Sequence, residues 1–406
     1  MKENELIRKR SKAKSVILFI TFSIGFAVSN FSQYQFSPLA SEIMELYGLS
    51  QVSYNALFTA PMIPAILFGI LSGVLVDKYG YKPVLGVAIT LTLIGAWLRV
   101  LIPSHMLMFA AMFLVGFSGD LFMANAAKVL ALLFGPEKVS VLAGLVMSIS
   151  TCGLVLVLST TSLMPSMVSA FILAAVIASV GFVLWFTMMP KIKPQQKPRE
   201  VTTPNNNKNG ALKSVLGNKN VWFAGVVAFC ACGAMSGTGS TVPAALMQER
   251  GISSEMAGVV ASMMMVGNLL GSTFTPTIAN KTGKFRATLM ICGALSALGC
   301  AFAWLAPEGI ALYAAMLVLG FAMGSGMASC MGIAVRIRGI GTEYAGTAGG
   351  MVTTLQLLGG VVLPTYIAST IAGGNYYVYF GIIGAFSLLW VICMFLLPKY
   401  LDVKSA

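Results

Sequence analysis

The chain has 406 residues, of which 57% are hydrophobic and only 10% are charged, with a mean hydropathy of +0.85. A soluble protein carries about 25% charged residues, so this chain has too few charges to cover a surface that faces water. Composition therefore excludes an ordinary soluble protein and indicates one embedded in a lipid bilayer. The net charge of +13 is compatible with nucleic-acid binding, but the basic residues lie between apolar stretches.

Twelve stretches are long and apolar enough to cross a bilayer, which takes about 20 mostly apolar residues in a helix. A membrane β-barrel would show alternating polarity instead of continuous apolar runs. The sequence therefore predicts an all-α membrane protein with twelve transmembrane helices. The first span follows a basic segment, as in a signal peptide, but without a clear small-residue cleavage site it is expected to be retained. The predicted spans are 15–40, 52–76, 83–103, 106–134, 139–162, 167–189, 219–247, 254–279, 287–306, 310–335, 345–371 and 376–397.

All Lys and Arg residues except Arg99, Lys128 and Arg250 fall on one side of the membrane if both termini share that side. The positive-inside rule then places both termini in the cytoplasm, with the chain in the cytoplasmic (cell inner) membrane. Basic residues next to an anionic inner leaflet account for the net charge, so no nucleic-acid partner is expected. Arg99, at the outer end of the third span, is expected to extend its side chain to the interface.

Residues 190–218 are rich in Pro, Asn and Lys, which predicts a cytoplasmic linker between an N-terminal six-helix bundle, 1–189, and a C-terminal one, 219–406. The two halves also resemble each other at a nearly constant offset. A shift of 203 positions places Tyr47–Ser50 on Arg250–Ser253 and Asp77–Gly80 on Asn280–Gly283, and a shift of 204 places Met112, Gly116 and Phe117 on Met316, Gly320 and Phe321. This offset predicts two six-helix pseudo-repeats, the pattern of secondary transporters with a midplane site between the repeats.

The connection between spans 2 and 3 contains the pattern G-x-x-x-D-K-x-G-x-K, formed by Gly73, Asp77, Lys78, Gly80 and Lys82. It closely resembles the 2–3 loop signature of the major facilitator superfamily, and Asn280–Lys284 is its degenerate echo between spans 8 and 9. The resemblance covers the whole chain and implies the major facilitator fold, with this loop acting in gating rather than in substrate binding. Span 4 lacks the R-x-x-x-G motif of many proton-coupled members, because Met112 stands at the arginine position.

Three further motifs resemble the haem- and choline-exporter branch related to the feline leukaemia virus subgroup C receptor. They are QY followed by YGLS, then GAWLRV at 95–100, then FGPEKVS at 134–140. The aromatic residues of a choline cage are missing, because the tyrosine position of span 7 falls near Thr238 and the glutamine position of span 5 near Thr151. Specificity for choline or haem is therefore not carried over.

Asp120 is the most informative polar residue, because it lies about fourteen residues into span 4, near the midplane. A carboxylate inside a membrane is costly and is a functional candidate by default. It could carry a coupling proton, bind a cation, accept hydrogen bonds from substrate, or pair with a polar neighbour. Lys128 lies two turns further along and about 80° round the helix, so the two are not expected to pair directly. Lys128 either attracts an anionic group of the substrate, or extends to the cytoplasmic interface, or meets Asp77.

Span 1 carries Asn30, Gln33 and Tyr34 on one helical face, by their i, i+3, i+4 spacing. The shift of 203 brings Gln33 onto Ser236 and Gln35 onto Thr238 in span 7, and polar stripes from two repeats are expected at a midplane site. Asn125 extends the stripe of span 4, and Gln356 is a weaker candidate in span 11. For each of them, interhelical hydrogen bonding that holds the bundle together is the rival interpretation.

The chain contains no G-x-x-x-x-G-K-[ST] phosphate loop, no metal-ligand cluster and a single histidine, so neither an enzyme nor a cofactor is expected. The sequence predicts a secondary transporter that moves a small polar or amphipathic organic solute by alternating access, as a monomer, with proton coupling left open. Three alternatives stay open: a multidrug efflux pump of the same fold, a lipid translocator, and a sensor or scaffold without transport.

Overall fold

The computed structural model describes residues 12–101, 104–134, 139–190, 215–336 and 341–398, apart from some side chains inside helices, among them those of Asp77 and Asp120. Within these ranges every regular element is a helix. Contacts divide the chain into two compact units. Unit 1 holds Met1–Leu39 and Leu57–Gln195, and unit 2 holds Ala40–Ala56 and Gln196–Ala406.

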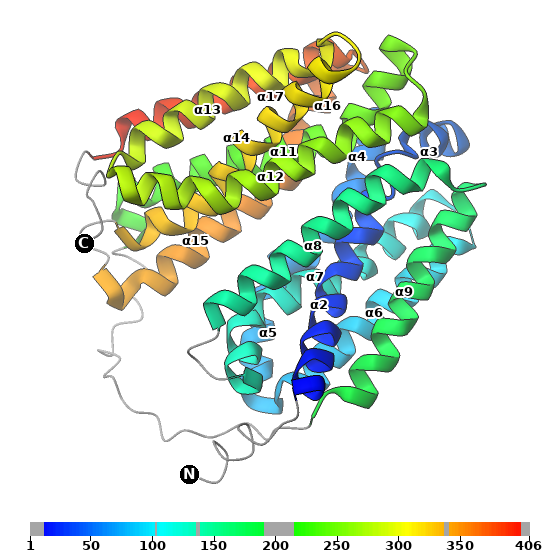
Figure 1. The fold of residues 1–406 in the computed structure, drawn as a ribbon, viewed down its shortest axis with the longest axis vertical. Coiled ribbons are helices and arrows are strands. Elements are labelled where there is room, and N and C mark those ends of the chain that lie inside the picture. The colour runs from blue at the N-terminus through cyan, green and yellow to red at the C-terminus, as the bar shows by residue number, and fades with distance from the viewer. Residues whose placement is uncertain (1–11, 102–103, 135–138, 191–214, 337–340, 399–406) are drawn as a thin grey trace. The chain divides into compact units, whose positions relative to one another are not determined.

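Unit 1 is a bundle of long antiparallel helices (Figure 1). Its elements are α2 (Lys12–Tyr34), the end of α4 (Gln51–Thr59), the 3₁₀ turn η1 (Ala60–Met62), α5 (Ile63–Tyr79), α6 (Tyr81–Val100), α7 (His105–Phe134), α8 (Val139–Thr160), η3 (Thr161–Leu163) and α9 (Met167–Met188).

Unit 2 has the corresponding long helices and takes in the short helix α3 (Ala40–Tyr47) and the start of α4. Its further elements are α11 (Lys219–Arg250), α12 (Ser254–Thr282), α13 (Phe285–Phe302), η4 (Ala303–Leu305), α14 (Ile310–Arg336), α15 (Gly341–Val362), the π-helical η5 (Leu363–Ala368), α16 (Ser369–Ala372) and α17 (Tyr376–Leu396).

The two units repeat one packing pattern. In unit 1, α5 packs on α7, α6 on α9, and α2 on α8 and α9; in unit 2, α12 packs on α14, α13 on α17, and α11 on α15 and α17. The turns repeat as well. Gly48 and Gly251 have φ of 60° and 64°, and Gly80 and Gly283 have φ of 88° and 67°, each pair 203 positions apart. These are backbone angles that glycine adopts without steric cost. The duplicated unit predicted from the sequence is therefore present in the structure.

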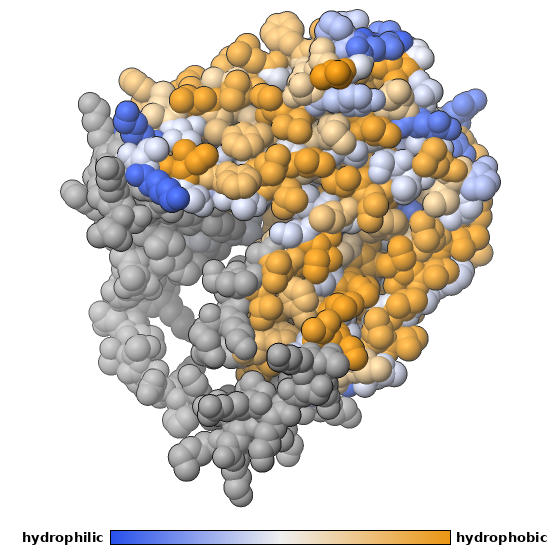
Figure 2. Space-filling view, in the orientation of Figure 1, coloured by the Kyte–Doolittle hydropathy of each residue, from blue (hydrophilic) through white to orange (hydrophobic). Residues whose placement is uncertain are grey.

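Eleven helices of the described ranges are long and apolar enough to cross a membrane, and Ile310–Gly326 is a shorter apolar stretch at the position of the predicted tenth span. Helices suit a bilayer because they satisfy their own backbone hydrogen bonds. Their outward faces are apolar, with Phe302 and Phe395 more than half exposed. In Figure 2 the visible face is mostly hydrophobic, and the hydrophilic residues gather at its margins. The chain is a multi-pass membrane protein.

The predicted spans 139–162 and 287–306 end in the 3₁₀ turns η3 and η4, and three others are interrupted further inside. The first, 15–40, contains the end of α2 at Tyr34 and a turn, and the second, 52–76, is broken by η1. Pro61 and Pro64 lie at this break, and neither has the N–H group that a continuous helix needs. The eleventh, 345–371, changes to a π-helix at Leu363, next to Pro364.

Close helix contacts in both units depend on glycine. A Cβ atom on Gly116 of α7 would overlap the carbonyl group of Pro61, and one on Gly320 of α14 would overlap that of Met264 in α12. Small residues allow helix backbones to approach this closely inside a membrane. The two positions are the pair that the shift of 204 aligned in the sequence.

Candidate functional site

The predicted polar stripe of α2 divides into a half-buried residue and two buried ones. Asn30 is half-buried and donates from Nδ2 to Ser150 Oγ of α8 at 3.2 Å. Gln33 is 3% exposed and donates from Nε2 to the carbonyl oxygen of Phe58 at 2.9 Å. The buried ring of Tyr34 meets Phe58 edge-on, with centroids 5.3 Å apart. In this arrangement Gln33 joins α2 to α4, whereas Asn30 keeps part of its surface free.

Asn125 of α7 is also committed to a neighbouring helix. It is 2% exposed, and its Nδ2 donates to Ser72 Oγ of α5 at 3.0 Å and to the carbonyl oxygen of Leu121 at 2.9 Å. Such a buried side-chain bond is the kind that holds membrane helices together. Asp120 directly precedes Leu121 on α7. The structure does not describe its side chain, so its predicted role stays a prediction.

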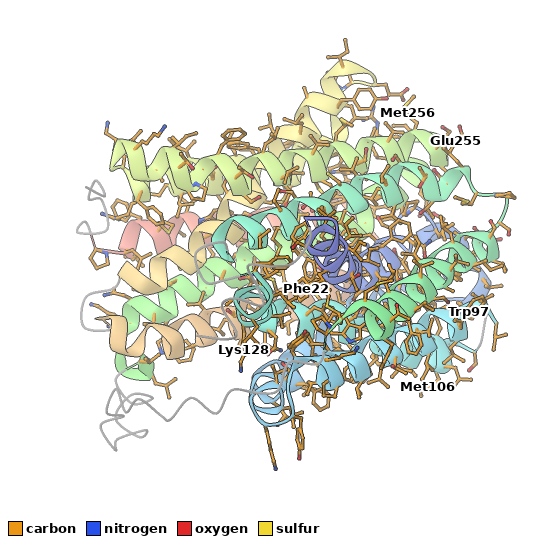
Figure 3. All side chains as sticks on the ribbon, turned by 60° about the horizontal axis from the view of Figure 1, so that its bottom comes forward. Phe22, Trp97, Met106, Lys128, Glu255 and Met256 are labelled. Carbon is orange, nitrogen blue, oxygen red and sulfur yellow. The ribbon has the colours of Figure 1, made fainter. Side chains whose placement is uncertain are left out.

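Lys128 lies towards the far end of α7. Trp97 and Met106 mark one end of unit 1, and Lys128 lies near the other (Figure 3). Its side chain is half-buried and takes part in an interaction. This placement suits a cation near a membrane interface, and contact with a solute remains a prediction.

The polar residues of α11 lie in its tightly packed middle. Thr238 is fully buried and donates to the carbonyl oxygen of Ala234 at 2.7 Å, which satisfies its hydroxyl within the helix. Ser236 is 1% exposed, and its Oγ has no hydrogen-bond partner in the structure as described. Buried hydroxyl groups nearly always have a partner, so Ser236 is the stronger candidate of the two for binding a ligand.

Gln356 of α15 is half-buried, and its Oε1 is enclosed without a hydrogen-bond partner among the described groups. The following π-helix, Leu363–Ala368, was not predicted. Its Pro364 carbonyl oxygen accepts from Ser369 Oγ at 2.6 Å, and Ser369 Oγ accepts from Asn55 Nδ2 at 2.7 Å. Single π-turns inside helices are frequent at functional sites, and Pro364 is the signal in the sequence that marks this one.

The predicted gating loop forms the tight turn between α5 and α6. Gly80, with φ of 88°, ends one helix and begins the next. Lys78 is exposed, with its Nζ 5.1 Å from the centroid of the Tyr79 ring, and Gly73 is half-buried within α5. The side chain of Asp77 is outside the described part. The turn is confirmed, whereas its gating role stays a prediction.

Lys82, also in this motif, holds the end of another helix. Its Nζ donates to the carbonyl oxygens of Phe186, at 3.0 Å, and of Met189, both at the C-terminus of α9. The last carbonyl groups of a helix lack partners within it and carry partial negative charge, so a cation there is stabilising.

Arg286 plays the same part in unit 2. Its Nε and Nη2 donate to the carbonyl oxygens of Met394, at 3.2 Å, and of Phe395, at 2.5 Å, in the last turn of α17. Lys284, which the sequence aligned with the loop motif, is exposed. Arg286 is therefore the structural counterpart of Lys82.

Arg99 does not reach the interface as predicted, because its side chain is 0% exposed. Its Nη1 donates to the carbonyl oxygen of Ser32 at 2.8 Å and its Nη2 lies 3.5 Å from Gln35 Oε1. The guanidinium carbon lies 5.0 Å from the ring centroid of Phe171 and 5.9 Å from that of Phe36. The end of α2 and two aromatic faces thus accommodate the buried cation.

Segment 40–56 is joined at both ends to unit 1 and packs on unit 2. The hydrogen bonds that hold it there include those from Tyr54 Oη to the carbonyl oxygen of Ser240 at 3.3 Å, from Asn55 Nδ2 to Ser369 Oγ at 2.7 Å, and from Gln248 Nε2 to Ser41 Oγ at 3.1 Å. Sequence reasoning missed this set, because the partners lie in the other repeat.

Two relatives match part of the chain. An uncharacterized protein of Archaeoglobus fulgidus is 31% identical over 150 residues, which are 37% of this chain and 67% of that protein. The MFS thioclapurine efflux transporter tcpA of Claviceps purpurea is 26% identical over 155 residues, which are 37% of this chain but only 28% of that transporter.

Solved structures share the fold at low identity. The nucleoside transporter NupG superposes with a TM-score of 0.74 at 12% identity, over 95% of this chain and 98% of that one. A bacterial homologue of the human lysosomal transporter Spinster, in an inward-facing and unoccupied conformation, superposes with a TM-score of 0.70 at 13% identity, over 98% and 100% of the two chains.

The family comparison covers most of the chain. The family model of the Major Facilitator Superfamily matches residues 17–364. Together with the repeated six-helix packing, this match shows that the chain belongs to the major facilitator superfamily.

Proposed function

We propose that this protein is a secondary transporter that moves a small polar or amphipathic organic solute across the cytoplasmic membrane by alternating access. Its family and fold are those of transporters. Polar side chains with unused capacity occur in spans of both repeats, namely Asn30, Ser236 and Gln356. Within unit 2 the proposed contacts with the solute are Ser236 and Gln356, and within unit 1 the proposed contact is Asn30. The remaining polar candidates have a supporting role, because their side chains contact their own helix or a neighbouring one; they are Gln33, Tyr34, Asn125 and Thr238.

The observation that carries the proposal is the attachment of segment 40–56 to unit 2. This segment belongs to the first repeat in sequence, and it is held through uncharged hydrogen bonds such as the one between Ser41 and Gln248. A net contribution of about 1 kcal/mol is typical of one such bond, so the set can form and break within a transport cycle. We infer that the segment leaves unit 2 once per cycle.

A reversible cross-link tests this inference. Ser41→Cys with Gln248→Cys, bridged by a short bis-methanethiosulfonate reagent in proteoliposomes, should stop solute uptake, and dithiothreitol should restore it. Gln248→Cys alone, treated in the same way, is the control and should keep its uptake. Full uptake by the bridged double variant would show that the segment does not need to move.

The solute is to be identified first by thermal stabilisation. Purified protein is heated with metabolites, organic cations, carboxylates and drugs at two pH values. A ligand at a hundred times its Kd adds about 2.7 kcal/mol of stability, which a melting curve detects. One chemical cluster of stabilising compounds supports a dedicated transporter, and those compounds then serve in the uptake assay.

Two further features belong to the proposal. Both termini and residues 190–218 face the cytoplasm by the positive-inside rule, and the protein acts as a monomer with the two bundles, 1–189 and 219–406, as its moving parts. The turn at Lys78 and Gly80 gates the cytoplasmic side.

Efflux of hydrophobic compounds is the alternative function with structural support. An apolar cavity of about 430 Å³ lies in unit 1 between α5, α6 and α7, lined by side chains that include Phe68, Leu71, Val87 and Phe117. An amphipathic drug or a lipid chain fits such a lining. Stabilisation by many unrelated hydrophobic compounds in the same screen would favour this alternative.

A further inference from the structure

A second cavity lies in unit 2, where segment 40–56 meets α11, α16 and α17. It has a volume of about 490 Å³, within the usual range of small-molecule sites. Its polar lining consists of Ser50, Gln51, Gln248, Ser369, Thr370 and Tyr376. Both sequence repeats contribute to this lining, and none of the residues predicted from the sequence to bind solute is part of it.

Gln51 is the unusual residue of this lining. Its side chain is 6% exposed, and both Oε1 and Nε2 are buried without a hydrogen-bond partner in the part of the chain that the structure describes. Leaving a buried polar group without a hydrogen bond is unfavourable, and this amide has two such atoms. Such a group needs partners that the described protein atoms do not provide, and a ligand in the cavity can supply them.

The other polar groups keep capacity for hydrogen bonds. Tyr376 Oη donates to Gln248 Oε1 at 3.0 Å, so its own oxygen can still accept. Ser369 Oγ uses its proton on the carbonyl oxygen of Pro364 and can accept a further bond beside that from Asn55. The cavity therefore offers acceptors from both residues, and the amide of Gln51 both donates and accepts.

The lining also defines the charge and shape of the ligand. No Lys, Arg, Asp or Glu is among the lining residues described. Met44, Leu49 and Val52 add apolar side chains to the same lining. A charged ligand would lose hydration without a counter-ion in the lining itself, which is costly. The complementary molecule is uncharged, with hydroxyl groups along its edge and a carbon-rich face.

We propose that this cavity is a binding site for a small uncharged polyhydroxylated molecule of monosaccharide size, recognised by the amide of Gln51. This site is distinct from the proposed solute contacts in the spans, and it is complete while segment 40–56 is held on unit 2.

Protection of an engineered cysteine tests the site in full-length purified protein. Thr370 is exposed and lines the cavity, so Thr370→Cys should react with a sulfonated maleimide, and mass spectrometry of the peptide carrying residue 370 follows the reaction. The neutral probes are D-glucose, myo-inositol and ribitol. A probe at ten times its Kd leaves about one tenth of the sites free and should slow labelling about tenfold. D-glucosamine and D-gluconate, which carry opposite charges on a similar skeleton, should protect far less.

Two substitutions at Gln51 make the test specific to its amide. In the Thr370→Cys background, Gln51→Leu should keep the labelling rate seen without probe, which reports an intact fold, and should lose protection by the neutral probes. Gln51→Glu should shift protection towards D-glucosamine, because a carboxylate favours an ammonium group. Glu308→Cys, in an exposed loop of unit 2, is the control position and should not be protected.

The proposal is overturned if no neutral probe protects residue 370, if the charged probes protect equally well, if Gln51→Leu keeps protection, or if Glu308→Cys is protected to the same degree. Because labelling needs no transport, these outcomes are independent of the cross-linking result for segment 40–56.

Discussion

Lys82 and Arg286 hold the same helix end in the two repeats, although one is a lysine and the other an arginine. They lie 204 positions apart, each at the start of the third helix of its repeat, and each donates to the terminal carbonyl groups of the sixth helix. In unit 1 the bond joins α6 to α9, and in unit 2 it joins α13 to α17. Both copies of the repeat therefore have a contact between a cationic side chain and the C-terminal end of the sixth helix, although the side chain differs.

Replacing Arg286 with Met should destabilise unit 2. The substitution leaves the carbonyl oxygens of Met394 and Phe395 without their donor, and hydrogen bonds to a charged group are worth about 1.5–3 kcal/mol. Thermal unfolding in detergent measures the loss. Lys284→Met is the matched control, because Lys284 is exposed and lies two positions away, and it should change stability by less than about 0.5 kcal/mol. Equal loss in both variants would contradict the assignment.

Arg99→Lys should be destabilising although it conserves charge. An ammonium group cannot bond to Ser32 and Gln35 in the planar geometry of a guanidinium, nor present a flat face to the stacked rings of Phe36 and Phe171. We expect a loss of about 1–3 kcal/mol, measured by denaturant unfolding in mixed micelles. Lys78→Met, which removes an exposed cation, should leave stability almost unchanged. A neutral effect of Arg99→Lys would mean that only the charge matters at this position.

Gly320→Ala should separate two helices of unit 2. The added methyl group overlaps the carbonyl group of Met264, which is backbone and cannot rotate away. Overpacking of this kind costs about 1–3 kcal/mol. Gly381→Ala is the control, because a Cβ atom there meets nothing within 4 Å and the residue lies inside α17. It should be neutral or stabilise by about 0.5–1 kcal/mol, since alanine favours a helix over glycine.

Asp120→Asn tests whether this carboxyl group carries a coupling proton. The amide cannot take up a proton, so uptake into proteoliposomes should lose its acceleration by an imposed pH gradient while solute binding persists. Glu255→Gln makes the same chemical change at an exposed carboxylate at the start of α12 (Figure 3) and should leave uptake unaltered. If Asp120→Asn keeps both the rate and the pH dependence, the coupling role is excluded.

The fold was largely predictable because a bilayer leaves few choices. Continuous apolar runs indicated the spans, and the constant offset between Gly48 and Gly251 revealed the repeat, since turns of this kind require glycine at fixed positions. The breaks were harder to predict. The apolar run through Pro61 reads like one span, and only the missing N–H groups of Pro61 and Pro64 mark the 3₁₀ turn there.

The partners of polar residues could not be predicted to the same extent. Arg99 was expected at the interface because a cation near a helix end usually extends to water. Its burial depends on the carbonyl oxygen of Ser32, which the last turn of α2 leaves free, and on two aromatic rings from other segments. Helical spacing likewise placed Asn30 and Gln33 on one face, but not the depth at which each lies.

Segment 40–56 belongs to unit 2 although it lies in the first repeat of the sequence, and this limits how the protein can be cut into fragments. The chain passes from one unit to the other after Leu39, after Ala56 and after Gln195, so cutting only within residues 190–218 yields two polypeptides that share unit 2. Fragments 1–195 and 196–406, produced together, should therefore assemble by complementation, with Tyr54 and Asn55 completing the second fragment. A C-terminal half produced without the first would leave apolar surface and the partners of these residues uncovered, and it should aggregate.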